Sequence, residues 1–96
     1  MSESHTVVNN KAASRFEAEI EGELAVLNYV ETDSTIELQH TDVPPALEGH
    51  GVGGSLAAAA LEYARQSGKR VIPTCPFVRS YIKRHPEWST LVNAAP

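Results

Sequence analysis

Four glycines stand within six consecutive positions of this chain, and an alanine-rich segment without glycine or proline follows them. The glycines are Gly49, Gly51, Gly53 and Gly54, and the segment covers residues 55–67. The first amide N–H groups of a helix have no intrahelical partner and lie at the positive end of the helix dipole. Glycine lets the backbone curl so that successive N–H groups point at one anion. This order predicts a phosphate cradle, against the alternative of a tight loop whose glycines only satisfy backbone angles.

Two common phosphate-binding patterns do not explain this turn. The spacing Gly49-x-Gly51-x-x-Gly54 matches the dinucleotide fingerprint, which needs a preceding strand of a parallel unit and an acidic residue about 20 positions later. Here the preceding strands are expected to be antiparallel, and position 74 is threonine. The Walker pattern needs a lysine after its last glycine, where this chain has Ser55. The ligand is therefore expected to be a different phosphate-bearing molecule.

Hydrophobic periodicity predicts the elements that hold the turn in place. Three strands joined by short turns form an antiparallel meander before it, over residues 16–21, 24–30 and 35–43. A helix, a strand parallel to the third one and a short helix follow it, over residues 55–67, 69–75 and 77–84. A short edge strand is expected at residues 6–8, and Gly68 is expected to end the first helix. The pattern predicts one domain, residues 1–96, of α/β (α+β) class with a mixed sheet.

Charge and composition restrict the partners. The net charge is −4, but it is uneven: residues 1–50 hold two Lys/Arg and ten Asp/Glu, whereas residues 51–96 hold six and two. An acidic chain argues against nucleic acid as a partner, and its acidic first half favours a cationic acceptor. No apolar run approaches the roughly 20 residues of a membrane helix, so no membrane partner is expected. Cys75 is the only cysteine, so no internal disulfide can form. We expect a cytoplasmic protein that is a monomer or a weak homodimer.

The stretch Glu48-Gly49-His50-Gly51-Val52-Gly53 resembles the Q/R-x-x-G-x-G/A signature of the GNAT superfamily of N-acetyltransferases. Further matching stretches are residues 40–44, the alanine-rich helix, Val71-x-Pro73-x-Cys75 and residues 81–87, so that the resemblance covers roughly residues 6–92. It implies that the turn wraps the pyrophosphate of acetyl-CoA. The cofactor-binding residues that it implies are Val43, Gly49, His50, Gly51, Val52, Gly53, Gly54, Ser55, Cys75 and Arg79.

Two features depart from the superfamily pattern. Glu48 stands where the signature has Gln or Arg, although a cradle of backbone N–H groups does not need that side chain. The chain also lacks the paired N-terminal helices that help to shape the acceptor site in larger relatives. The acceptor pocket is therefore expected to be open, or completed by another chain.

The same resemblance nominates catalytic residues, each with a simpler alternative. Cys75 would line the acetyl cleft or accept the acetyl group covalently, or it is a small buried apolar residue. His40 shares the predicted strand face of Ile36 and Leu38, so we expect it to point inward as a general base, or to be a satisfied core histidine. Asp42 would orient His40 or act itself. Tyr81 would protonate the leaving thiolate, or pack on a helix face.

Basic residues of the last helix complete the set. Arg79, Lys83 and Arg84 could pair with phosphates of the cofactor, or form an ordinary solvated surface. No metal site is expected, because His40, His50, Cys75 and His85 lack paired ligand spacings. The leading hypothesis is transfer of an acetyl group from acetyl-CoA to an amine or lysine-bearing acceptor by direct attack. The alternatives are a noncatalytic acyl-CoA-binding module and an interaction subunit whose turn is purely structural.

Overall fold

The computed structural model describes residues 5–92 and contains one five-stranded sheet with the strand order β1-β2-β3-β4-β5. The strands are β1 Val8–Asn10, β2 Arg15–Ile20, β3 Glu23–Glu31, β4 Thr35–Asp42 and β5 Arg70–Pro73. The first four pair antiparallel in sequence order, and β5 pairs parallel with β4. The predicted meander and mixed α/β class are therefore confirmed, and the predicted edge strand lies two residues later than expected.

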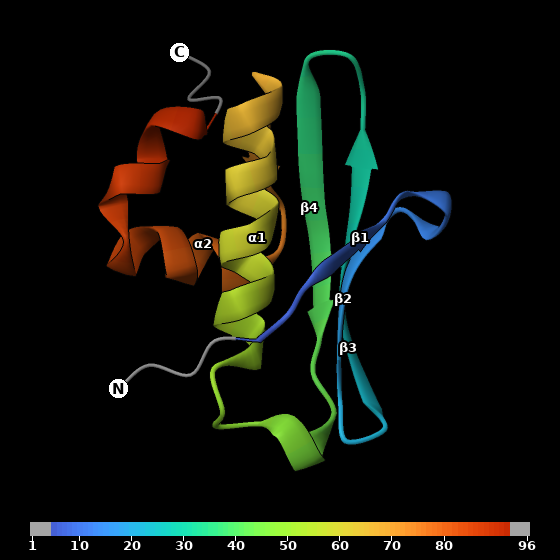
Figure 1. Ribbon diagram of the computed structural model, residues 1–96. Helices are drawn as coiled ribbons and strands as arrows, with labels where there is room; N and C mark the ends of the chain where they lie inside the picture. The colour runs from blue at the N-terminus through green and yellow to red at the C-terminus, as the bar shows by residue number, and fades with distance from the viewer. Residues whose placement is uncertain (1–4, 93–96) are drawn as a thin grey trace.

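Two α-helices follow the meander, α1 Val52–Ser67 and α2 Pro76–Arg84. Both lie on the same side of the sheet (Figure 1). The helix α1 makes the crossover that β4 and β5 need in order to run parallel. It ends at Gly68, whose φ of 69° is the left-handed geometry of a C-cap, as predicted. Among residues 5–92, no helix has the length and hydrophobicity that a membrane crossing would require.

The core lies between the helices and one face of the sheet. Alternate strand residues reach it, as period two requires: Phe16 and Ala18 from β2, and Ile36 and Leu38 from β4, are buried. The helix α1 contributes Leu56, Ala60, Leu61 and Ala64, and its alanines allow it to approach the sheet closely. The opposite face of the sheet is open in the described chain. There Val26 lies between Glu17 and Asp42, its cross-strand partners.

A β-bulge divides β4 into two halves. Tyr29 pairs with Leu38, but Asn28 pairs with His40, so Gln39 is an extra residue without a partner on β3. An extra residue reverses the alternation of the strand beyond it. Leu38, before the bulge, is buried. Gln39 and His40 are both exposed, because the bulge places His40 on the opposite face from Leu38. The prediction that His40 points inward with Ile36 and Leu38 was wrong, because it assumed an unbroken period of two.

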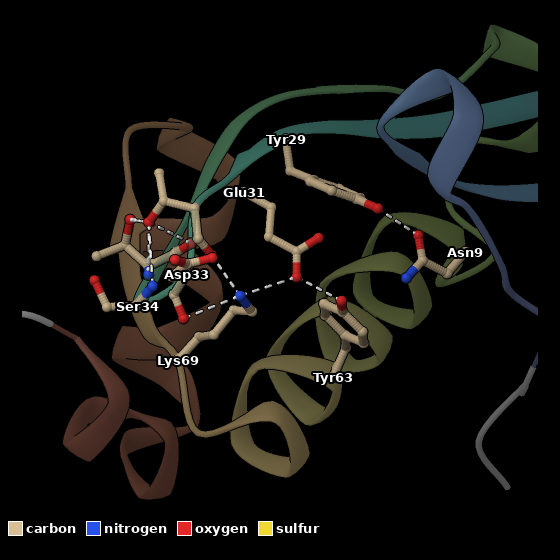
Figure 2. Close-up of polar contacts among 9 residues, drawn as sticks. Asn9, Tyr29, Glu31, Asp33, Ser34, Tyr63 and Lys69 are labelled. Carbon is tan, nitrogen blue, oxygen red and sulfur yellow. Dashed lines mark hydrogen bonds and ion pairs between the residues drawn. The ribbon is translucent and has the colours of Figure 1, made fainter.

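A polar cluster fastens the C-terminal part of α1 to the end of β3 (Figure 2). The hydroxyl of Tyr63 donates to Glu31 at 2.5 Å, and the Lys69 ammonium lies 3.3 Å from the same carboxylate oxygen. Lys69 also donates to the carbonyl oxygen of Thr32. The Tyr63 hydroxyl, followed by the Lys69 ammonium, holds the pKa of Glu31 below its usual value. The cluster lies at the opposite end of α1 from the glycine-rich turn and supports the fold.

Candidate functional site

A pocket of about 590 Å³ opens where β4 ends and α1 begins. The segment that links them passes through the short 3-10 helix Pro45–Leu47 and the glycine-rich turn, which lies at the lower end of Figure 1. The helix α2 forms the remaining wall. The residues that line the pocket are Thr41, Asp42, Val43, Leu47, Glu48, Gly49, Gly51, Val52, Gly53, Gly54, Phe77, Tyr81 and Arg84.

The four glycines serve two different purposes. Gly49 and Gly51 have φ angles of 85° and 78°, which side chains rarely tolerate, so they set the curl of the turn. Gly53 and Gly54 lie within α1, which begins at Val52 and not at Ser55 as predicted. Ser55 donates the first hydrogen bond of the helix, to the carbonyl of Gly51 at 3.0 Å. The N–H groups of residues 52–54 precede it and have no intrahelical acceptor, as an anion site requires.

Gly53 and Gly54 allow the aromatic residues of α2 to approach α1. A Cβ atom at Gly53 would lie 2.8 Å from the Cζ atom of Phe77, which is closer than van der Waals contact permits. At Gly54 the corresponding atom would lie 3.5 Å from the Tyr81 ring. The Phe77 side chain rests against the first turn of α1 and is still 37% exposed, because it faces the pocket.

The wall of the pocket nearest the sheet is the place where β4 and β5 separate. Their pairing ends at Leu38 and Pro73, and the backbone N–H of Cys75 then donates to the Leu38 carbonyl at 2.9 Å. Beyond this point β4 has no strand partner on its β5 side within the described residues. The thiol of Cys75 lies 3.3 Å from the hydroxyl of Thr41, and the Cys75 residue is only 3% exposed. Thr41 lines the pocket, whereas Cys75 does not.

Tyr81 is the titratable hydroxyl of the pocket. Burial, with a smaller contribution from Glu87, raises its pKa above the usual value of about 10, and the nearby Arg84 charge opposes this shift. The phenol is therefore protonated at neutral pH and can donate a proton. The ring of His85 packs on it with a centroid separation of 4.2 Å, which holds the ring in place.

The structure brings together most, but not all, of the predicted site residues. Those that line the pocket are Asp42, Val43, Gly49, Gly51, Val52, Gly53, Gly54 and Tyr81. Those that do not line it are His40, His50, Ser55, Cys75 and Arg79. His40 lies on the open face of the sheet, on the same side of the strand as Asp42. Arg79 directs its guanidinium at the carbonyl oxygens of Pro73 and Thr74, at 3.4 and 3.2 Å.

Five lining residues were not among the predicted site residues: Thr41, Leu47 and Phe77 were missed, Glu48 was named only as a departure from the signature, and Arg84 only as one of several cations. Thr41 was missed because the bulge at Gln39 was not foreseen, and Leu47 because it lies in an irregular connection. Phe77 and Arg84 share a helical face with Tyr81 at i, i+4 and i+7 spacing, so this stripe on α2 was the signal that could have found them.

The strand, glycine-rich turn and helix, with a pocket at the separating strands, are the arrangement found in the acyltransferase class of mixed α/β folds, and the comparison with protein families agrees. The sequence model of the family described as GCN5-related N-acetyl-transferase matches residues 15–91. That match covers most of the chain. The chain belongs to the GCN5-related N-acetyltransferase family, whose chemistry is acyl transfer.

Individual relatives agree with this assignment. The protein NATD1 of Xenopus tropicalis is 32% identical over 88 residues, which cover 88% of this chain and 81% of the frog protein. NATD1 of Gallus gallus is 37% identical over 51 residues, covering 53% of this chain and 46% of its own length. The solution structure of a GCN5-like protein from Staphylococcus aureus matches with a TM-score of 0.70 at 22% identity, covering 98% of this chain and 93% of that chain. At that identity the similarity shows the common fold.

Proposed function

We propose that this protein transfers an acetyl group from acetyl-CoA to a primary amine. The observation that carries the proposal is the pocket at the start of α1, where unpaired helical N–H groups, two left-handed glycines and an apolar wall meet. The N–H groups of residues 52–54 suit a pyrophosphate. Phe77, Val43 and Leu47 suit the apolar part of the pantetheine arm. The thioester would then lie toward Thr41, where β4 and β5 separate.

Direct attack by the amine is the mechanism that we propose. The nitrogen lone pair would attack the thioester carbonyl carbon, the C–N bond would form and the C–S bond would break. Tyr81 is the proposed proton donor to the leaving thiolate, since its phenol is protonated and lines the pocket. The position of Cys75 argues against a covalent acetyl intermediate, because the residue is only 3% exposed and does not line the pocket.

The acceptor is proposed to arrive from the open face of the sheet. Asp42 belongs to both that face and the pocket, so its carboxylate is the proposed acceptor of the amine proton, directly or through water. His40 lies two residues earlier on the same face and could pass the proton on to solvent. Glu19 adds negative charge to this face, which favours a cationic amine or a lysine-bearing peptide, whereas the charge of Glu17 is balanced by Arg15.

Two measurements test the proposal. Calorimetry should show binding of CoA to the unmodified protein, and an acceptor screen should show amine-dependent release of free thiol from acetyl-CoA. Binding without any amine-dependent release would favour the noncatalytic acyl-CoA-binding module. Absence of CoA binding would reject the donor assignment.

A further inference from the structure

The pocket is lined by more acidic than basic residues, which disfavours the binding of an anionic donor. Two acidic residues, Asp42 and Glu48, line the pocket near the unpaired N–H groups of α1. Each would repel a phosphate held at the helix start, and Glu48 directly precedes the turn. Partial helix charges of about half a unit do not offset two full charges nearby. A side-chain cation in the same pocket would offset this repulsion.

Arg84 is the one lysine or arginine that lines the pocket among residues 5–92. It lies in the last turn of α2, on the same helical face as Phe77 and Tyr81. Its guanidinium makes no hydrogen bond or ion pair within the described chain. The charge of Arg84 acts on the Tyr81 phenol, which places the guanidinium within electrostatic reach of the pocket wall.

The other basic side chains of α2 have different surroundings. Arg79 is held by the carbonyl oxygens of Pro73 and Thr74. Lys83 is exposed and does not line the pocket. Arg84 is therefore the basic residue of α2 that lines the pocket and makes no hydrogen bond or ion pair within residues 5–92.

We infer that Arg84 binds a phosphate group of the donor and offsets the repulsion from Glu48. This inference rests on the proposed function, since it concerns the same pocket. Guanidinium and phosphate form charge-assisted hydrogen bonds that are stronger than neutral ones. The phosphate belongs either to the pyrophosphate or to the 3′-phosphate of CoA, and the experiment below distinguishes the two.

The test is calorimetric binding of CoA to the unmodified protein, Arg84→Gln and Lys83→Gln. Arg84→Gln should weaken CoA binding by about tenfold or more, as expected for loss of a charge-assisted contact. Lys83→Gln removes the same charge from the neighbouring position and should change the affinity by less than about twofold. Thermal melts confirm that both variants are folded. With 3′-dephospho-CoA, the loss in Arg84→Gln disappears if the contact is to the 3′-phosphate and persists if it is to the pyrophosphate.

The double variant Glu48→Gln/Arg84→Gln separates contact from overall charge. It has the same net charge as the unmodified protein, so a pure field effect would restore the original affinity. A direct contact predicts that its binding stays several-fold weaker, whereas Glu48→Gln alone binds CoA more tightly. Full recovery in the double variant, or equal losses in Arg84→Gln and Lys83→Gln, would overturn the role of Arg84. If the unmodified protein binds no CoA, the proposed function fails together with this inference.

Discussion

The hydroxyl of Thr41 and the thiol of Cys75 lie 3.3 Å apart across the point where β4 and β5 separate. Thr41 lines the pocket and Cys75 does not, so the sulfur is next to a lining residue without itself reaching the pocket surface. This relationship decides how the cysteine can be tested.

Cys75→Ala should keep most of the amine-dependent turnover, because direct attack needs the sulfur only as part of the wall. A nucleophilic cysteine would instead lose several orders of magnitude in kcat on the same substitution. Intact-protein mass spectrometry after incubation with acetyl-CoA, without acceptor, supplies the second readout. A stable acetyl adduct on Cys75 that added amine discharges at the turnover rate would establish the covalent route.

Gly51→Ala should weaken CoA binding strongly while the domain still folds. Its φ of 78° lies in the left-handed region, and no atom lies within 4 Å of the added Cβ, so the expected cost is backbone strain of about 1 kcal/mol. Gly51→Val, with its branched side chain, should abolish binding. Gly22 offers a matched control, since its φ is 81° with equally open surroundings at a distant turn. Gly22→Ala should lose similar stability, measured by urea unfolding, and keep its CoA affinity.

Gly53→Ala and Phe77→Ala should be energetically coupled. When Phe77 is present, the new methyl group would lie only 2.8 Å from the ring, so the ring must move. Without the ring, alanine in place of glycine stabilises α1 by up to about 1 kcal/mol. A double-mutant cycle of unfolding free energies should therefore give a coupling of about 0.5 kcal/mol or more. Gly54→Ala, which faces Tyr81 at an ordinary contact distance, should show no such coupling to Phe77; additive effects at Gly53 would contradict the predicted contact.

Tyr63→Phe should destabilise the fold at neutral pH by about 1 kcal/mol, equivalent to a fall in Tm of about 4–8 °C for a domain of this size. The variant removes the hydroxyl that lowers the pKa of Glu31. A lowered folded-state pKa gives stability that is present above the unfolded-state value, near 4.5, and is lost as the pH falls through the folded-state value. Thermal melts should therefore show a smaller difference between variant and parent at pH 3 than at pH 7. An equal difference at both values would mean that the Glu31 charge is not involved.

Basic acceptors should react with a KM that rises with added salt, since screening weakens their attraction to the acidic open face. Glu19→Gln should raise that KM modestly, because Glu19 lies exposed on this face opposite Leu24. Glu62→Gln, on α1 and outside the pocket, is the control and should not change it. A preference for carboxylate-rich acceptors that is insensitive to salt would contradict the proposed approach.

Much of the architecture could be predicted from the sequence, because its signals are local. Alternation in β2, the alanine-rich run of α1, Gly68 at its end and the glycine-rich turn each depend on neighbouring residues only. The parallel pairing of β5 with β4 followed from the intervening helix. The glycine-rich turn and the alanine-rich helix are also the features by which the sequence resembles the acetyltransferase family.

The contents of the pocket depended on contacts between distant residues. The approach of Phe77 to Gly53, and of Thr41 to Cys75, joins residues 24 and 34 positions apart, and no periodicity encodes such a pair. The bulge at Gln39 arises from the pairing of β4 with β3. It turns His40 outward and brings Thr41 inward. The sequence by itself determined that a turn able to bind an anion precedes a helix, because backbone geometry is local. Only the tertiary structure decided which side chains face that turn, because one unpaired residue in a strand exchanges its two faces.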